Sequence, residues 1–424
     1  MSIPAHSKPE RTYQTWLKQS VLSSHINAYA TYLSKRGYSA NTLGFYMHSV
    51  AHFSHWLAKR KIGLQQINEG LVRRFITVHL PACDCNGRCR KKQDATLWAA
   101  LRHLLRFLRL NAYIPPRVGS VSRAVQEELD RFDIYLEKVC GLALKTRLLR
   151  IHYLSKFLPS VFKHGPIDLA TLRLRPKDIE QFVIHHGEGC TRGSIQVICC
   201  CLRTYLRFRA FEGDCTEALI AAVPRIRYWR LGSLPKRLTD QELKQFLAAF
   251  DHTTVNGRRN YAMARCLVDL GLRVGEVARL KLEHFDWRQG TLQIVGSKGR
   301  RVDVLPLPVQ TGRAIVQYLR NARPKCASRD LFVRHMAPLD RPLTTEIVRW
   351  AMRCAYARAG LSRPYPGSHA LRHSFACRLL NAGASLKEIA DVLRHRSLNS
   401  STIYTKVDLK RLTTVALPWP GRTA

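Results

Sequence analysis

Acidic residues are scarce in this sequence. Its 424 residues contain 30 Asp and Glu against 69 Lys and Arg, a formal net charge of +39. Residues 237–424 carry 32 basic and 14 acidic side chains, a net +18, and the remainder carries +21, so neither half holds the excess. This deficit of negative charge favours a polyanionic partner, most simply nucleic acid, contacted by several domains. The alternative is a protein that is basic only because its whole proteome is basic.

Long apolar runs are also missing. The longest ones, such as residues 194–202, fall well short of the about 20 residues that span a bilayer, so we expect no membrane protein. The first residues, MSIPAHSKPERTYQTW, lack the apolar stretch of a secretory signal, so we expect a cytoplasmic protein. Apolar residues still make up 46% of the chain, which is enough to fill conventional cores and excludes wholesale disorder.

Cysteine is sparse and odd in number, with 13 residues in the chain. Without an export signal, most of these side chains should be small buried hydrophobes rather than disulfide partners. One group stands apart: His79, Cys83, Cys85 and Cys89 lie in the string HLPACDCNGRC, around an Asn-Gly turn. Four soft ligands at this spacing could hold a structural Zn²⁺. The spacing matches no common zinc-knuckle pattern, so a chance cluster without metal is the alternative.

The first half of the chain contains an internal repeat. The string YLSKRGYSANTLGFYMHSVAHFSHWL from Tyr32 aligns with YLEKVCGLALKTRLLRIHYLSKFL from Tyr135, and LRHLLRFLRLNA from Leu101 aligns with LRTYLRFRAFEG from Leu202. Both copies place apolar residues at i, i+3, i+4 and i+7, which predicts a bundle of about four amphipathic helices in each. The first copy is longer by the segment that contains the His/Cys cluster.

Arginines accompany the apolar stripe in the last helix of each copy. The positions are Arg102, Arg106 and Arg109 in the first copy, and Arg203, Arg207 and Arg209 in the second. Solvated helix faces are the ordinary explanation for such side chains. In a chain this basic we favour faces that contact phosphates.

The second half of the chain begins after a basic segment with two prolines, PRIRYWRLGSLP at residues 224–235, which predicts an interdomain linker. Thr239 and Glu242 then have the spacing of a capping box at the start of a helix. The strings TLQIVG and RRVDVLPL, separated by the turn residues SKGR, predict a β-hairpin. Helical patterns resume afterwards, so residues 237–424 should form an α+β domain with a small antiparallel sheet.

Four strings in this half carry side chains suited to phosphate chemistry. GLRVGEVARL supplies Arg273 and Glu276, GSKGRRVDVLPL supplies Lys298, SHALRHSFA supplies His369 and Arg372, and LRHRSLNSSTIYT supplies His395 and Tyr404. Singly, each residue has an ordinary explanation as an ion-pair partner, a turn lysine or a core aromatic. In this order and within these strings, the set closely resembles the catalytic domain of the tyrosine recombinase (phage integrase) family, in its Xer-like branch.

The resemblance covers residues 238–407, and it implies a mainly α fold. The helical copy at 122–224 is similar to the core-binding domain that precedes the catalytic domain in this family. The copy at 16–114 would be an additional helical DNA-binding module, which the simplest members lack. We therefore expect apparently duplicated helical-bundle domains at 16–114 and 122–224, followed by an α+β catalytic domain at 237–424.

The activity that the resemblance implies is site-specific recombination or integration, for a mobile element. Tyr404 would attack a phosphodiester of duplex DNA and form a 3′-phosphotyrosyl intermediate. That bond conserves the phosphoester, so no cofactor is expected. Lys298 would protonate the departing 5′ oxygen, and His369 would assist proton transfer.

The same resemblance implies that two guanidiniums bind the charged oxygens of the transition state. Arg273 and Arg372 offer forked, permanently charged donors, and His395 would add another. Glu276 would orient Arg273 or the neighbouring histidine rather than react. No Asp/Glu cluster suited to two-metal phosphoryl transfer accompanies these residues, which fits metal-independent chemistry.

The partner implied is double-stranded DNA, with a homo-tetramer on two DNA sites and accessory recombinases left open. The short tail after Tyr404 would pack on a neighbouring subunit, the alternative being a terminus that docks on its own chain. Three alternatives use the same residues or their remnants: a type IB-like topoisomerase, an Xer-type chromosome-dimer resolvase, and a non-catalytic DNA-binding descendant. The presence of all six catalytic candidates argues against a non-catalytic descendant. Supercoil relaxation without strand exchange between two sites would indicate a topoisomerase.

Overall fold

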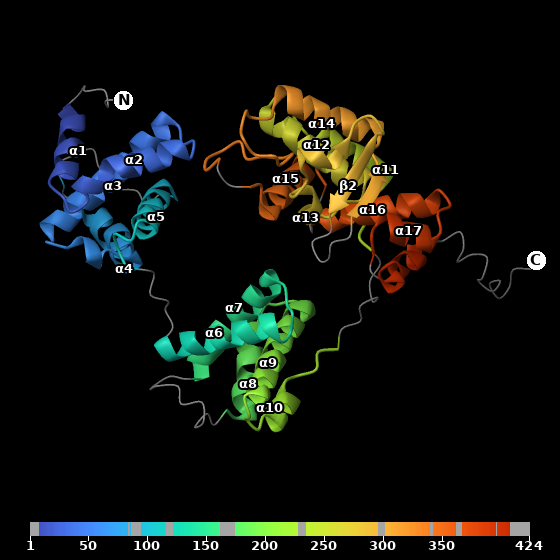
Figure 1. Cartoon of the computed structure of the whole chain (residues 1–424), viewed down its shortest axis with the longest axis horizontal. Helices are drawn as coiled ribbons and strands as arrows, with labels where there is room; N and C mark the ends of the chain where they lie inside the picture. The colour runs from blue at the N-terminus through green and yellow to red at the C-terminus, as the bar shows by residue number, and fades with distance from the viewer. Residues whose placement is uncertain are drawn as a thin grey trace, which may run out of the picture. The chain divides into compact units, whose positions relative to one another are not determined.

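The structure, a computed structural model, describes residues 8–83, 85, 95–115, 122–161, 174–227, 235–295, 302–339, 342–361, 367–395 and 397–407. In chain order, these residues form two helical sets and a C-terminal set that contains a small sheet (Figure 1), and each set is described by itself. None of the helices in these ranges combines the length and apolarity needed to cross a membrane. Most of the predicted linker (228–234) and most of the tail after Tyr404 (408–424) lie outside the described residues.

The first helical set is built around the long helix α3. It comprises α1 (Lys8–Lys18), η1 (Ser23–His25), α2 (Ile26–Lys35), α3 (Ala40–Lys59), η2 (Leu64–Gln66), α4 (Glu69–Arg74), the π-helical η3 (Phe75–His79), η4 (Leu80–Ala82) and α5 (Ala95–Leu110). Ser39 caps α3 by accepting a hydrogen bond from the Thr42 amide. The inner face of α3 buries Phe53 and Trp56 against Phe75.

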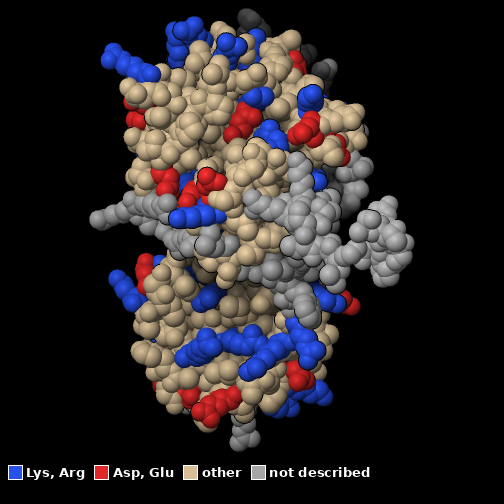
Figure 2. Space-filling view, turned by 90° about the vertical axis from the view of Figure 1, so that its right-hand side faces the viewer, with Lys and Arg blue, Asp and Glu red and all other residues tan. Residues whose placement is uncertain are grey.

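The second helical set repeats this plan without the π-helical turn. It comprises α6 (Arg123–Lys138), α7 (Leu144–Val161), α8 (Pro176–Gly187), α9 (Arg192–Phe211) and α10 (Glu217–Ala222). A buried carboxylate, Glu128, accepts hydrogen bonds from the Tyr205 hydroxyl at 2.9 Å and from Arg209 at 3.3 Å. Lys and Arg side chains gather in a row on one face of this set (Figure 2).

The two helical sets share the same internal packing. Tyr32 lies against Phe107 with ring centroids 5.3 Å apart and planes at 49°, and Tyr135 lies against Phe208 with the same two values. The aligned core positions are buried in both sets: Leu33 and Leu136, Phe53 and Phe157, Phe75 and Phe182, Leu101 and Leu202. This shared packing is what the predicted duplication implies.

The arginines along α5 and α9 divide into two groups. Arg109 forms a bidentate pair with Glu69, both contacts at 2.7 Å, and Arg209 is buried against Glu128. Arg203 donates to two backbone carbonyls. These three anchor the helices internally. A phosphate-contacting face fits the exposed members, which are Arg102, Arg106 and Arg207.

The C-terminal set surrounds the small sheet with helices. It comprises α11 (Asp240–Ala248), α12 (Val255–Asp269), α13 (Val274–Val277), η6 (Leu282–His284), β1 (Phe285–Asp286), β2 (Thr291–Val295), β3 (Val302–Pro306), α14 (Val309–Asn321), α15 (Thr345–Arg358), α16 (Gly367–Asn381), α17 (Leu386–Val392), η7 (Leu398–Ser400) and η8 (Thr402–Val407). One continuous apolar core joins α11, α12, α14, α15 and the start of α16 to the sheet.

The predicted hairpin and helix start are both confirmed. β2 pairs antiparallel with β3 in a register that runs from Thr291 opposite Pro306 to Val295 opposite Val302, and the two-residue strand β1 extends the sheet on the other side of β2. The Thr239 side chain accepts from the Glu242 amide while the Glu242 carboxylate accepts from the Thr239 amide, which is the capping box at the start of α11. The observed fold class is the one predicted: mainly α, with a small antiparallel sheet in the C-terminal set.

Candidate active site

The short helix α13 brings the first two predicted residues together. Arg273 is its N-cap, and Glu276 lies one turn later on the same face. The Glu276 carboxylate accepts from the Arg273 backbone amide at 2.7 Å and from its guanidinium at 2.9 Å. A second cation, Arg394, donates to the same carboxylate at 2.8 Å. Burial alone would raise the pKa of Glu276, but Arg394 and Arg273 outweigh it and hold the pKa below its ordinary value.

Arg372 lies on α16 and is buried, with only 5% of its surface exposed. Its guanidinium donates to the backbone carbonyls of Gly271 and Leu393. Burial, with the nearby charge of Arg273, lowers the pKa of Arg372 to about 9. Gly271 has φ +58°, and a Cβ there would lie 2.5 Å from the Phe375 ring. The turn that presents this carbonyl to Arg372 therefore requires glycine.

Tyr404 lies on η8 and is almost fully buried, in an apolar cluster that includes Cys377, Leu380 and Leu393. Its hydroxyl is hydrogen-bonded to Nδ1 of His373 at 3.1 Å. Burial raises the pKa of Tyr404 to about 12, although the charge of Arg372 opposes that shift. The phenol is therefore protonated at neutral pH, and its attack on any substrate must release a proton.

Two further histidines face the same cations. His395 follows α17, and its Nδ1 is hydrogen-bonded to the Ser401 hydroxyl at 2.7 Å. Desolvation, with Arg372 and Arg273, lowers the pKa of His395 to about 4, so its ring is neutral at neutral pH. His369, near the start of α16, has an exposed side chain. Partial desolvation and the charge of Arg372 lower its pKa as well.

The structure thus groups five of the six predicted catalytic residues, together with Glu276. The five are Arg273, His369, Arg372, His395 and Tyr404. The sixth, Lys298, lies outside the described residues. Three guanidiniums lie in the site, those of Arg273, Arg372 and Arg394, and Glu276 is the one carboxylate among their described contacts. The site therefore carries uncompensated positive charge, which suits an anion.

Sequence reasoning missed two residues of this site. His373, which contacts Tyr404, directly follows Arg372, and Arg394, which holds Glu276, directly precedes His395. The only available signal was adjacency to a predicted residue. Neither contact could be predicted from sequence spacing, because 31 positions separate His373 from Tyr404 and 118 separate Arg394 from Glu276.

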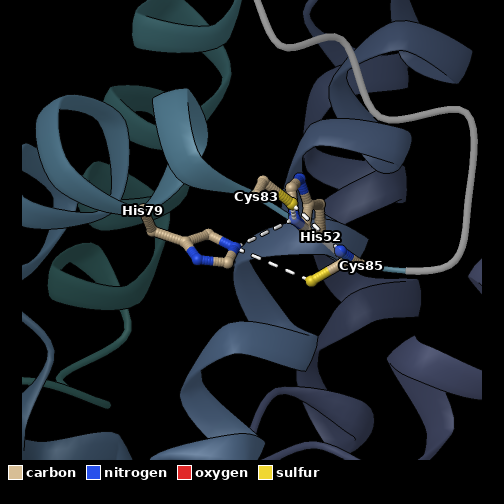
Figure 3. Close-up of side chains that lie close together, drawn as sticks. All are labelled: His52, His79, Cys83 and Cys85. Atoms are coloured by element: carbon tan, nitrogen blue, oxygen red, sulfur yellow. Dashed lines mark hydrogen bonds between the residues drawn. The ribbon is translucent and has the colours of Figure 1, made fainter.

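A second cluster of reactive side chains lies in the first helical set (Figure 3). His52, His79, Cys83 and Cys85 place one nitrogen or sulfur atom each within 4.8 Å of one another. The predicted metal site contained the last three of these residues. Its fourth predicted member, Cys89, lies outside the described residues, and His52 on α3 was not predicted.

Comparison with known protein families identifies two regions of the chain. Residues 236–411 match the phage integrase family, and residues 26–111 match the phage integrase N-terminal SAM-like domain. The first match contains every predicted catalytic position. The second falls on the first helical set and includes the His/Cys cluster.

Similar proteins match over most of the chain. It is 35% identical to y4rA of Sinorhizobium fredii, whose name groups it with the integrases and recombinases, over 94% of both chains. It is 29% identical to tyrosine recombinase XerA of Pyrococcus furiosus, over 68% of this chain and 91% of that protein.

Solved structures of two DNA-bound enzymes share the fold. XerH site-specific recombinase bound to palindromic difH substrate has a TM-score of 0.54 at 22% identity, covering 73% of this chain and 92% of that one. A lambda integrase tetramer bound to a Holliday junction has a TM-score of 0.53 at 17% identity, covering 74% and 88%.

Proposed function

We propose roles for individual residues of this chain, which belongs to the phage integrase family. Members of this family are tyrosine recombinases, enzymes of site-specific recombination that cut and rejoin DNA. Tyr404 is the nucleophile. Arg273, Arg372 and His395 bind the non-bridging oxygens of the phosphate, and Glu276 fixes the orientation of Arg273.

The observation that carries this proposal is the concentration of buried positive charge beside a tyrosine. Arg372 and Arg394 are 5% and 8% exposed, and the pKa of Arg372 is lowered by its neighbours as well as by burial. Like charges held this close repel each other, so a bound phosphate would stabilise the arrangement more than water does. Charge that develops on the phosphate oxygens meets donors that are already oriented, and this lowers the barrier to cleavage.

The bond changes follow from the chemistry of a phosphodiester. The Tyr404 hydroxyl oxygen forms a bond to phosphorus as the bond from phosphorus to the 5′ oxygen breaks. The phenol proton moves to His373, whose Nδ1 lies 3.1 Å from the hydroxyl in the buried position and keeps this contact when Tyr404 is presented to the phosphate. Burial lowers the pKa of His373, so its ring is neutral and can accept the proton. Lys298 supplies a proton to the departing 5′ oxygen, as the family resemblance implies. The reverse sequence rejoins the strand.

The buried position of Tyr404 implies a conformational step before cleavage. Its side chain is 1% exposed and packs among apolar residues of α16 and α17. A phosphate cannot reach a hydroxyl in that environment, so η8 must move to present it. We propose that DNA binding drives this movement, so that the Tyr404 hydroxyl stays buried until DNA is bound.

The assembly and the biological role are proposed by analogy. Lambda integrase is a tetramer on a Holliday junction, and XerH binds its difH substrate. We propose a homo-tetramer on two duplexes for this chain, acting for a mobile element. The relation to y4rA and to the phage integrase family supports that role.

The nucleophile is tested by trapping the covalent intermediate. Full-length protein is incubated with nicked genomic DNA fragments, the adducts are digested with nuclease, and the peptide that carries the nucleotide is identified by mass spectrometry. We expect the mass increase on Tyr404, no adduct with Tyr404→Phe, and normal adducts with the control Tyr261→Phe. An adduct in Tyr404→Phe would overturn the assignment.

The role of His373 is tested with the same assay. The variant His373→Phe keeps a ring against Tyr404 but has no proton acceptor. We expect adduct formation to slow by about a hundredfold, the usual scale of general base catalysis, with the deficit shrinking as pH rises. Equal loss at every pH would indicate a packing role instead.

A further inference from the structure

The His/Cys cluster of the first helical set approaches the donor spacing of a tetrahedral metal centre. The Nε2 atoms of His52 and His79 are 3.2 Å apart. Cys83 Sγ lies 3.3 Å from His52 Nε2, and Cys85 Sγ lies 3.7 Å from His79 Nε2. A tetrahedral ion with metal–nitrogen bonds of about 2.0 Å and metal–sulfur bonds of about 2.3 Å holds its donor atoms about 3.3–3.8 Å apart. Three of the six donor pairs are thus at or close to this spacing, and all four donor atoms lie within 4.8 Å of one another (Figure 3).

The local fold is shaped around this convergence. His52 projects from the middle of α3, whereas His79 ends the π-helical segment η3 that continues α4. The wider π turn is uncommon and frequently occurs at functional sites. The chain then tightens into η4 and presents Cys83 and Cys85 two residues apart, with the Cys85 amide donating to Cys83 Sγ at 3.4 Å.

Aromatic rings enclose the cluster. The Trp16 ring stacks on His52, and Phe75 lies against His52 edge-on and stacks on His79. Cys83 is 5% exposed and His52 is likewise buried. Such walls limit water access to the donors, which suits a closed structural site rather than one with an open catalytic position.

The equivalent region of the second helical set carries only two of the four donors. His186 and Cys190 follow Phe182 at the same spacing as His79 and Cys83 follow Phe75, but Lys156 stands at the position aligned with His52 and Arg192 at the position aligned with Cys85. The second set instead buries the Glu128–Arg209 pair. The first set is thus the copy that has both the histidine on the long helix and the second thiol.

We propose that His52, His79, Cys83 and Cys85 bind one Zn²⁺ ion, which fastens the segment after η4 to α3. Two imidazoles and two thiolates in tetrahedral array select zinc over the oxygen-preferring Mg²⁺ and Ca²⁺. Zinc also adds no redox chemistry to the protein. The ion stabilises the first helical set because the unfolded chain cannot hold these ligands together.

Metal analysis of the full-length chain tests the proposal. After purification with zinc and extensive washing, wild-type protein should retain about one zinc ion per chain, as expected of a single structural site. Cobalt exchanged into the site should give the visible bands of tetrahedral coordination with thiolate charge transfer. Less than a tenth of an ion per chain, or an octahedral cobalt spectrum without thiolate bands, would overturn it.

Variants separate this ligand set from the one predicted by sequence. His52→Gln and Cys83→Ser should each lower zinc retention at least tenfold, whereas the exposed-site control Cys140→Ser should retain it. If His52→Gln retains zinc and Cys89→Ser loses it, the predicted set replaces the proposed one. Should the variants fail to fold, chelation of the wild-type protein decides: removal of zinc must lower the melting temperature reversibly, and no shift contradicts a structural role.

Discussion

Arg394 is a residue whose side chain and backbone serve the same site. Its φ of +56° is a left-handed conformation, which costs a residue other than glycine on the order of 1 kcal/mol. Its guanidinium donates to Glu276 at 2.8 Å, and its carbonyl accepts from Arg273 at 3.5 Å. The strained conformation is therefore compensated by contacts that orient Arg273.

Replacing Arg394 by glycine and by alanine separates these contributions. Both variants leave Glu276 with one cation fewer, so we expect adduct formation to slow about tenfold in each. Only alanine keeps the backbone cost, so Arg394→Gly should resist urea better than Arg394→Ala by about 1 kcal/mol. Wild-type cleavage rates in Arg394→Gly would show that the side chain does not position Arg273.

His395 should make the protein less stable in acid. Its pKa is about 4 in the folded chain, against an ordinary value of 6.5. Between these pH values the unfolded chain binds a proton that the folded chain does not, so the free energy of unfolding falls as pH falls from 6.5 towards 4. Because the side chain is only half-buried, we expect an effect on the order of 1 kcal/mol.

The variant His395→Gln isolates this effect. It keeps a hydrogen-bonding side chain near Ser401 but does not titrate, so its unfolding free energy should fall less between pH 7 and pH 5 than that of wild type. His185→Gln, at an exposed position of α8, should behave as wild type does. Identical pH dependence in His395→Gln and wild type would contradict the assignment.

At the scale of elements, α6 and α9 are joined by one buried carboxylate. The Glu128 side chain is 1% exposed and accepts from Tyr205 and Arg209. Removing this carboxylate takes a buried acceptor from Tyr205 and Arg209, but Arg209 keeps its ion pair with Asp214 at 2.6 Å, so we expect a cost of about 2 kcal/mol. Glu128→Gln should therefore lower hydrogen-exchange protection in α6 and α9 about thirtyfold.

The neighbouring residue provides a matched control for that experiment. Glu127 pairs with Arg123, but the two side chains are 62% and 94% exposed. Surface pairs of this kind contribute about 0.5 kcal/mol or less, so Glu127→Gln should leave protection almost unchanged. Equal losses in the two variants would show that Glu128 contributes only as a helix residue.

These elements show what can be predicted from the sequence. Periodicity identified the two helical sets, and strand alternation with turn residues identified the hairpin, because such patterns are local. The Glu128–Arg209 pair links residues 81 positions apart, and no local pattern encodes it. The same reason explains why His52 was missed: it lies on α3, 27 positions before His79, outside the compact His/Cys string.

The residues of the candidate site could be predicted from the order in which their short strings follow one another along the sequence. Arg273, Arg372, His395 and Tyr404 come from separate strings, yet the structure groups them around shared charges. The buried position of Tyr404 was not predictable, because it depends on how η8 packs against α16 and α17. That packing decides whether the Tyr404 hydroxyl can be reached.

For the whole molecule, the charge of +39 divides almost evenly, with +18 in residues 237–424 and +21 in the remainder. A few of these charges belong to the candidate active site, and others, such as Arg109 and Arg209, are neutralised by internal ion pairs. What remains is spread over exposed surfaces of all three sets of elements. The affinity for DNA should therefore come from many separate phosphate contacts and fall steeply with salt.

The salt dependence of DNA binding tests whether the first helical set contributes phosphate contacts. Each phosphate contact adds roughly 0.9 to the slope of log affinity against log salt concentration. Arg102 and Arg106 are exposed on α5, so the double variant Arg102→Gln/Arg106→Gln should lower the slope by about 2 on random-sequence duplex DNA. The control Glu69→Gln/Arg109→Gln removes an internal ion pair without changing the net charge, and its slope should equal that of wild type. If neither double variant changes the slope, this face of α5 does not contact phosphates, and the charge of the first set serves another surface.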